Sequence, residues 1–325
     1  MPNLPKKNPA TVTQANTVKK EEKIKELHSI KLLNQLALSA DNAIFDSSIK
    51  GRNHKPSSEE QTVLENFSTL EEEKLAVLGI DIYKYSQFPP HKQKIIPSLF
   101  FFLKFLTENC FSNSESLFSY HYDVENLKND FIHTGDGGYL FFKNPLEATI
   151  FLQLFNIAVH LFNSHHLFPG IRNYLDEPIT LRYTITFDTL YKIDHKFFGP
   201  AIIHNARIIS KDKLNRFLID NNTYEWFLDN TNGIENLPNI YRKDLSHLEI
   251  SNTEKPLKTT FFNSTSISKI RNVFCQKLEK ITVKDDHFEV YNIMIQSLGS
   301  FFQRNDIENA ITVITTVGNM NCNGI

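Results

Sequence analysis

The sequence predicts an α+β fold, with a ferredoxin-like sheet that carries helices packed on it. From Leu75 onward, short apolar runs alternate with longer segments whose apolar residues recur at a helical period. Asp136, Gly137 and Gly138 join two further apolar runs, which is typical of a tight antiparallel hairpin. Strands that lead directly into helices, with a hairpin between them, favour this class of fold.

Each element follows from its local pattern. An apolar run that ends in an acid predicts a strand over 75–82, and an apolar stripe predicts a helix within 88–110. Pro145 is a favourable first-turn residue, so a helix is predicted from there to about Asn163. The remaining predictions are strands at 178–190 and 217–219, helices at 199–213 and 222–228, and strand-like residues at 248–262.

Composition divides the chain into four parts. Residues 1–20 are polar and rich in lysine and proline, which predicts a disordered tail. Residues 21–70 predict a helical N-terminal extension, with helices at 21–40 and 57–74, and residues 71–262 predict the α+β domain. Residues 263–325 predict a mostly helical C-terminal extension, with helices near 266–280 and 288–303 and a strand at 311–317.

Charge and cysteine content narrow the classes of function. Lys+Arg 35 against Asp+Glu 37 gives a formal charge of -2, so we expect no nucleic-acid partner and no membrane attachment. Cys110, Cys275 and Cys322 are far apart and odd in number, which argues against a disulfide framework or a cysteine zinc site. No apolar segment of the signal-peptide type follows the first lysines, and we expect a cytoplasmic location.

Two acids at strand ends form the candidate chemical site. Asp81 ends the predicted strand 75–82, and Asp136 lies on the hairpin turn. A single Gly-Asp-Gly is more often only a turn, but two such acids on neighbouring elements can hold Mg²⁺ or Mn²⁺ between them. A pair of metal ions stabilises both the attacking and the leaving oxygen in phosphoryl transfer. Arg207, on the helix after Gly199, is a candidate to meet charge on the phosphates.

Three motifs carry a resemblance to a known family. They are Gly-Ile-Asp-Ile-x-x-Tyr at 79–85, Thr-Gly-Asp-Gly-Gly at 134–138, and Phe-Gly-Pro-Ala-x-x-x-x-Ala-Arg-Ile at 198–208. In this order and spacing, they resemble the signatures of class III nucleotidyl cyclases, the adenylate and guanylate cyclases, over about residues 70–262. The resemblance implies a homodimer with active sites at the subunit interface.

The resemblance also implies roles for the matched residues. Asp81 and Asp136 correspond to the ligands of two divalent cations, Mn²⁺ or Mg²⁺, with help from the backbone of Ile82. Arg207 corresponds to the arginine that meets the triphosphate from the opposite subunit. Tyr85 matches an aromatic residue that covers the triphosphate loop, while Tyr83 either faces the base or packs.

The positions that read the purine in these cyclases are altered. Ile132 stands four residues before Asp136, where adenylate cyclases carry lysine. Lys196 stands where they carry Asp or Thr, and Ile203 replaces the usual asparagine four residues before Arg207. An apolar Ile132 leaves a base edge unpaired, at a cost on the order of 1 to 3 kcal/mol for each group. Recognition of adenine in the usual manner is therefore not expected.

Two interpretations of these changes stay open. The pattern resembles the Pycsar-type pyrimidine cyclases of bacterial antiphage defence, which implies cyclic UMP or cyclic CMP as the product and a downstream effector that responds to it. UTP is expected over CTP, with Lys196 donating to a pyrimidine carbonyl. Alternatively, the domain is a degenerate cyclase that only binds nucleotide or dimerises. The transition-state lysine falls among Lys243, Lys255 and Lys258, because the family position aligns near Ser251.

Overall fold

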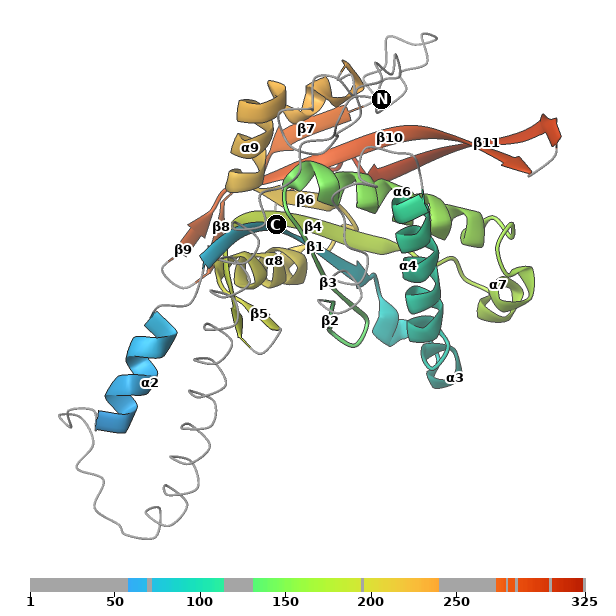
Figure 1. Ribbon diagram of the computed structural model, residues 1–325. Helices are drawn as coiled ribbons and strands as arrows, with labels where there is room; N and C mark the ends of the chain where they lie inside the picture. Colours follow the sequence, from blue (N-terminus) through green and yellow to red (C-terminus); the bar gives the residue numbers. More distant parts are fainter. Residues whose placement is uncertain are drawn as a thin grey trace, which may run out of the picture. The chain divides into compact units, whose positions relative to one another are not determined.

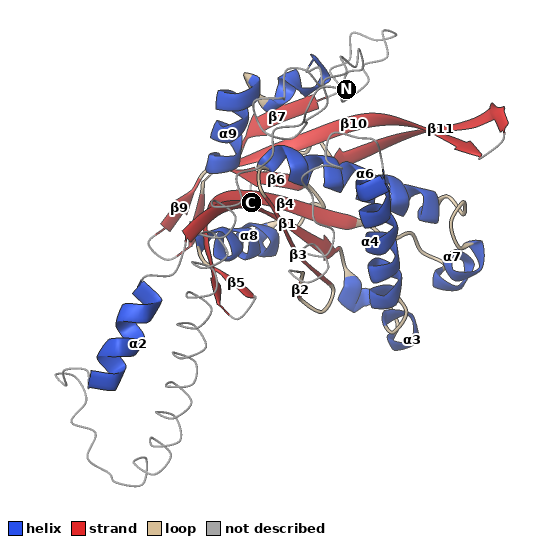
Figure 2. Cartoon of the chain, viewed as in Figure 1, coloured by secondary structure: helices blue, strands red, loops and turns tan. Residues whose placement is uncertain are grey.

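The computed structural model describes residues 58–68, 72–113, 131–193, 196–239, 273–278, 280–283, 286–303 and 306–323. The chain divides into two compact units. The larger unit contains residues 73–190 and 199–325, and the smaller unit contains residues 1–72 and 191–198. Figure 1 labels the elements, and Figure 2 distinguishes helices from strands.

The larger unit is built on a mixed sheet with the strand order β11-β10-β6-β4-β1-β3-β2, and β7 also pairs with β10. The pairs β1–β3, β2–β3, β6–β10, β7–β10 and β10–β11 are antiparallel, and β4–β6 is parallel. The strands are β1 (Glu72–Ile82), β2 (Ile132–His133), β3 (Gly137–Phe142), β4 (Leu181–Ile193), β6 (Phe217–Asp220), β7 (Val273–Lys277), β10 (Val290–Gln303) and β11 (Asp306–Gly318). Together with the helices, this sheet confirms the predicted α+β class.

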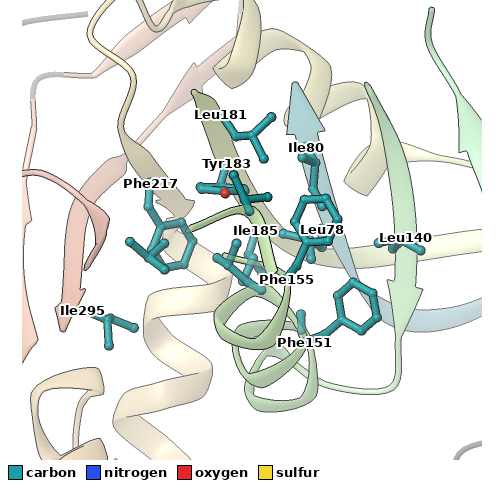
Figure 3. Packing of buried hydrophobic residues seen from close by; sticks show 14 of the residues in the cluster. Leu78, Ile80, Leu140, Phe151, Phe155, Leu181, Tyr183, Ile185, Phe217 and Ile295 are labelled. Carbon is teal, nitrogen blue, oxygen red and sulfur yellow. The ribbon is translucent and has the colours of Figure 1, made fainter. Parts of the chain in front are cut away.

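One face of the sheet is covered by α4 (Ile96–Asn113), α6 (Pro145–Asn163) and α9 (Asn221–Thr231). Phe151 and Phe155 of α6 point at Leu78 and Ile80 of β1 and at the neighbouring strands (Figure 3). These residues are almost fully buried. The α6 helix starts and ends where the sequence predicts. Its start is set by Pro145 in the first turn and by the Asn144 side chain, which accepts a hydrogen bond from the Glu147 N–H at 3.0 Å.

The other face carries α8 (Pro200–Lys211). The Asn205 side chain donates to the Val77 and Thr184 carbonyls, so it joins α8 to β1 and β4. A second apolar cluster lies on this side and consists of Ile208, Leu218, Leu278, Ile281 and Val290. Since successive residues of a strand point to opposite faces, Gly79 and Asp81 face α8 while Leu78 and Ile80 face α6.

Shorter elements complete the larger unit. They are the 3₁₀ helices η1 (Tyr85–Gln87) and η2 (Ile234–Asn239), the helices α3 (Pro90–Gln93) and α7 (Pro169–Leu175), and the hairpin of β8 (Ile281–Val283) and β9 (Asp286–Phe288). Among the described residues, α6 alone is long and apolar enough to cross a bilayer, and 67% of its apolar window is buried in the protein. The burial identifies α6 as a core helix.

The C-terminal part differs from the prediction. The expected helices near 266–280 and 288–303 are absent where the structure describes these ranges, which instead contain β7 and β10. Val290, Tyr291 and Ile293 are β-branched or aromatic and pack well on a pleated sheet, and β10 hydrogen-bonds to β6 of the same sheet. The strand predicted at 311–317 is confirmed as part of β11.

The smaller unit contains α2 (Ser58–Ser68) and a hairpin formed by the end of β4 and by β5 (Lys196–Phe198). In this hairpin, Tyr191 pairs with Phe198 and Ile193 with Lys196. The helix predicted at 57–74 is therefore confirmed in its first part, and β1 begins at Glu72. The predicted tail at 1–20, the helix at 21–40 and the strand-like residues at 248–262 lie outside the described residues.

Candidate active site

The first acid lies at the end of a buried strand. In β1, residues from Leu75 to Ile82 are buried, and Asp81 is only 9% exposed. Asp81 pairs with Gly137 of β3 in the antiparallel register, so the strand end lies against the hairpin turn. The apolar run therefore places a carboxylate at an edge of the core where water has little access.

The hairpin brings the second acid to the same place. The Asp136 carbonyl accepts a hydrogen bond from the Ile82 N–H at 2.9 Å, and the Thr134 N–H donates to the Gly137 carbonyl at 3.1 Å. Gly135 has φ +102°, which favours glycine at the turn. Gly137 allows the close approach of β3 to β1, because a Cβ there would lie 2.0 Å from the Ile80 carbonyl oxygen. Asp136 itself is half-buried.

Electrostatics link the two acids. Burial raises the pKa of Asp81 above its ordinary value, and the adjacent Asp136 carboxylate raises it further. Two carboxylates at close range in a poorly solvated position repel each other, and a divalent cation between them would offset that repulsion. The residues therefore fit a Mg²⁺ or Mn²⁺ site formed by Asp81, Asp136 and the backbone of Ile82. The Ile82 N–H already donates to the backbone carbonyl of Asp136. The carbonyl of Ile82 is therefore the backbone group of this residue that a cation could use.

The described residues supply only part of a metal coordination shell. Nowhere in those residues do three or more His, Cys, Asp or Glu side chains gather in a way that could hold a metal ion. Two carboxylates and one carbonyl leave room for phosphate oxygens and water, as Mg²⁺ commonly requires when it binds a nucleotide. A metal ion held by these groups would thus keep coordination positions for a phosphorylated substrate.

Arg182 is a site residue that the sequence analysis missed. Its Nε donates to Asp81 Oδ2 at 2.5 Å, and its Nη1 donates to the Asp212 carbonyl at 2.5 Å. The positive guanidinium opposes the effect of burial on the pKa of Asp81. The sequence held a signal for this contact, because Leu181 and Tyr183 alternate onto the core face of β4 and so place Arg182 on the face of Asp81.

Tyr139 is a second residue that the sequence analysis missed. It pairs with Gly79 of β1 in the register, on the same sheet face as Asp81. Burial raises the pKa of Tyr139, and the negative charges of Asp81 and Asp136 raise it further. Its aromatic side chain therefore lies within the electrostatic reach of both acids.

The two tyrosines after Asp81 make separate contacts. The Tyr83 hydroxyl donates to the Lys213 carbonyl at 2.9 Å, and its ring is half-buried. The Tyr85 hydroxyl donates to the Gln93 carbonyl at 2.9 Å, and its ring packs against the main core. In this structure, both hydroxyl groups are bonded to the protein backbone.

The other predicted site residues are distributed over the chain. Ile132 is half-buried on β2 and pairs with Tyr139, so it lies on the hairpin that carries Asp136. Lys196 is exposed on β5 in the smaller unit, and Ile203 is 49% exposed on α8. Lys243, Lys255 and Lys258 lie outside the described residues.

Arg207 lies on α8 and is half-buried. Its guanidinium carbon is 5.7 Å from the centroid of the Phe288 ring, a distance that permits a cation–π interaction. The charged groups that perturb Asp81 are Arg182 and Asp136. The structure therefore brings Asp81, Ile82 and Asp136 together within one chain and places Arg207 beside β9.

Comparisons with known proteins give matches at the level of structure. No family model matches the sequence, and no curated protein matches it. The adenylyl cyclase CyaB from P. aeruginosa is similar over 73% of this chain and 98% of its own, with 13% identity and a TM-score of 0.40. The guanylyl cyclase Cya2 is similar over 69% of this chain and 93% of its own, with 10% identity and a TM-score of 0.41. An adenylate/guanylate cyclase/hydrolase from Silicibacter pomeroyi is similar over 69% of this chain and 97% of its own, with 13% identity and a TM-score of 0.40.

Proposed function

We propose that this protein is a nucleotide cyclase that converts a pyrimidine nucleoside triphosphate, UTP, into the 3′,5′-cyclic monophosphate and pyrophosphate. The observation that carries the proposal is the juxtaposition of Asp81, near the end of β1, and Asp136, in the turn before β3, where the Ile82 N–H donates to the Asp136 backbone carbonyl. The three cyclase-like motifs around Asp81, Asp136 and Arg207 support the same reaction class.

The reaction is an intramolecular phosphoryl transfer. The ribose 3′-oxygen attacks the α-phosphorus and forms a new P–O bond, the bond from that phosphorus to the bridging oxygen of pyrophosphate breaks, and the 3′-hydroxyl proton passes to solvent. Asp81, Asp136 and the Ile82 carbonyl would hold two Mn²⁺ or Mg²⁺ ions. When bound, such ions lower the pKa of the 3′-hydroxyl and offset charge on the triphosphate. Arg207 offsets negative charge on the transferring and leaving phosphates.

A pyrimidine substrate is supported by Ile132. This residue lies on the hairpin strand that pairs with β3, and its side chain has no polar atom to bond a purine nitrogen. Lys196 is proposed to donate a hydrogen bond to a carbonyl of the pyrimidine. Ile203 occupies the position where class III cyclases usually carry an asparagine. Tyr85 is proposed to cover the triphosphate loop. Tyr83 is proposed either to face the base or to pack, with its hydroxyl on the Lys213 carbonyl.

We also propose that the protein works in the cytoplasm as a homodimer. In it, Arg207 would contact the triphosphate that is bound by the acids of the opposite subunit. The product would serve as a signal in antiviral defence, read by an effector that the cyclic nucleotide activates. The resemblance to the pyrimidine cyclases supports this role. Cytidylate cyclase activity, with CTP as substrate, is the nearest alternative.

A specific observation favours a second candidate, a degenerate domain that binds nucleotide or dimerises without catalysis. Arg182 already forms an ion pair with Asp81, so the protein itself supplies one positive charge at the site. A binding module would need no more than this. Catalysis is preferred because both acids and Arg207 are present, and a binding module has no physical need for that set.

The test is to incubate the purified protein with Mn²⁺ and each of the four ribonucleoside triphosphates and to identify products by mass spectrometry. We expect cyclic UMP from UTP, and no such product from a matched Asp136→Ala protein. Cyclic CMP as the main product would support the alternative base. Cyclic AMP would contradict the inference from Ile132, and no cyclic product from any triphosphate would support the binding module.

A further inference from the structure

The loop of residues 212–216, which follows α8, contacts the candidate active site through its backbone carbonyls. The Asp212 carbonyl accepts from Arg182, whose Nε also holds Asp81 Oδ2. The next carbonyl, that of Lys213, accepts from the Tyr83 hydroxyl at 2.9 Å. Arg182, which contacts the Asp81 carboxylate, and Tyr83, two residues after Asp81, are therefore both held by one short piece of backbone.

The same loop is held on its other side by the C-terminal segment, defined here as residues 319–323. The Asn319 side chain donates to the Leu214 carbonyl at 3.0 Å and to the Asn215 carbonyl at 2.9 Å. Arg216 Nη1 donates to the Asn323 carbonyl at 2.7 Å and to the Asn321 carbonyl at 3.3 Å. Of four consecutive carbonyls, those of 212 and 213 thus accept from Arg182 and Tyr83, and those of 214 and 215 accept from the C-terminal segment.

The loop is also held together by contacts among its own residues. The Asp212 carboxylate accepts from the Arg216 N–H at 2.9 Å and from the Leu214 N–H at 3.2 Å, and it pairs with Arg216 Nε at 2.8 Å. Asp212 and Arg216 are each 1% exposed. Breaking a buried and hydrogen-bonded ion pair leaves a charge without compensation, so the pair ties the loop to the segment that Arg216 contacts.

We infer that the C-terminal segment is a positioning element of the candidate active site, and that Asn319 is its positioning residue. Asn319 fixes the 212–216 loop, the loop fixes Arg182, and Arg182 orients the carboxylate of Asp81. The inference rests on the proposed function in one respect only, the assignment of Asp81 as a metal ligand. It gives residues far outside the cyclase-like motifs a part in metal binding.

The test compares Asn319→Ala with Met320→Ala. Met320 is the adjacent residue of the same segment and is 62% exposed, so its truncation is a matched control. Binding of Mn²⁺ alone is measured by electron paramagnetic resonance, with kcat/KM and Tm recorded in parallel. We expect Asn319→Ala to weaken Mn²⁺ binding about fivefold with a Tm close to that of the wild type, because changes along such networks alter coupling by roughly this amount. Met320→Ala should bind Mn²⁺ as the wild type does.

A double-mutant cycle with Arg182→Lys separates positioning from general destabilisation. Lysine offers one ammonium in place of the guanidinium fork that holds both Asp81 and Asp212. If Asn319 acts through Arg182, adding Asn319→Ala to Arg182→Lys should weaken Mn²⁺ binding by less than about twofold further. The inference would be overturned if the double variant lost Mn²⁺ affinity by the product of the two single losses, or if Asn319→Ala bound Mn²⁺ as tightly as the wild type. A wild-type protein that binds no Mn²⁺ would also overturn it. A wild-type protein that binds Mn²⁺ but forms no cyclic nucleotide would overturn the proposed function alone.

Discussion

At the scale of single residues, the site is determined by what surrounds each carboxylate. Asp81 is buried at a strand end, close to a second acid and to one arginine. Burial and Asp136 favour the protonated form, whereas Arg182 favours the ionised form. A cation bound beside Asp81 would stabilise the ionised form of its carboxylate against burial and against Asp136. This is the physical reason for proposing a metal site here.

Replacing the second acid tests this assignment. We expect Asp136→Asn to reduce kcat by about 1,000-fold, equivalent to about 4 kcal/mol of transition-state stabilisation, because the neutral amide is a poor ligand for a divalent cation. Cyclic nucleotide formation, followed by mass spectrometry, measures the loss. Asp229→Asn, at an exposed position on α9, is the control and should retain activity. Near-normal activity in Asp136→Asn would remove the metal role from this residue.

Glu147 gives a prediction about pH. Burial raises the pKa of this first-turn residue of α6 to about 7. The folded protein therefore holds a proton that the unfolded chain has released between about pH 4.5 and pH 7, so stability falls as pH rises through this window. Glu147→Gln should remove this part of the fall, about 3 kcal/mol by linkage. Urea unfolding at pH 5 and pH 8 measures it.

The buried Asp220 has a pKa raised to about 7 by the same cause and titrates in the same window. It remains in the Glu147→Gln protein, so the pH dependence should become shallower without disappearing. Equal slopes in the wild type and in Glu147→Gln would contradict the assignment of the window to Glu147.

At the scale of elements, the pairing of β1 with β3 sets the position of both acids. The register places Gly137 opposite Asp81, and β3 approaches β1 closely because Gly137 has no side chain. Since side chains alternate across a strand, a shift of one residue would turn Asp81 away from α8 and into the core. The hairpin is therefore a positioning element as well as a structural one.

Gly137→Ala tests this close approach. A Cβ at this position would lie 2.0 Å from the Ile80 carbonyl oxygen and 2.9 Å from the Asp81 Cα, so the strands must separate. We expect a loss of about 3 kcal/mol in the free energy of unfolding, measured by urea titration. Gly170→Ala is the matched control, because a Cβ there meets nothing within 4 Å. Equal stability in the two variants would show that the strands can accommodate the methyl group.

At the scale of the whole molecule, the proposal requires two chains for each site. Arg207 lies beside Phe288, and the charged groups acting on Asp81 are Arg182 and Asp136. In a twofold-symmetric dimer, the same surface of each chain meets its counterpart, so each Arg207 would serve the acids of the partner.

Mixing two inactive proteins tests the shared site. Asp136→Ala and Arg207→Ala should each be inactive alone. Their equal mixture should recover about one quarter of wild-type activity, because half of the dimers are mixed and each mixed dimer has one intact site. Cyclic nucleotide formation after subunit exchange is the measurement. A mixture as inactive as its components would place Arg207 outside a shared site.

Local sequence patterns determined the elements whose residues interact with near neighbours in the chain. The strand that carries Asp81 near its end, the hairpin that carries Asp136 and the helix from Pro145 each follow from apolar periodicity, turn glycines or a first-turn proline. The two acids could be proposed as a pair from the sequence, because each lies where a predicted element ends.

Only the tertiary structure decided the contacts between distant residues. Arg182 lies 101 residues from Asp81, and Asn319 lies more than 100 residues from the loop that it holds. The C-terminal strands differ from the predicted helices because segments such as 290–298, where apolar residues are interrupted by polar ones, suit either element, and pairing with β6 decides between them. Periodicity reports which face of an element is buried, whereas the partner on that face depends on how the whole chain packs.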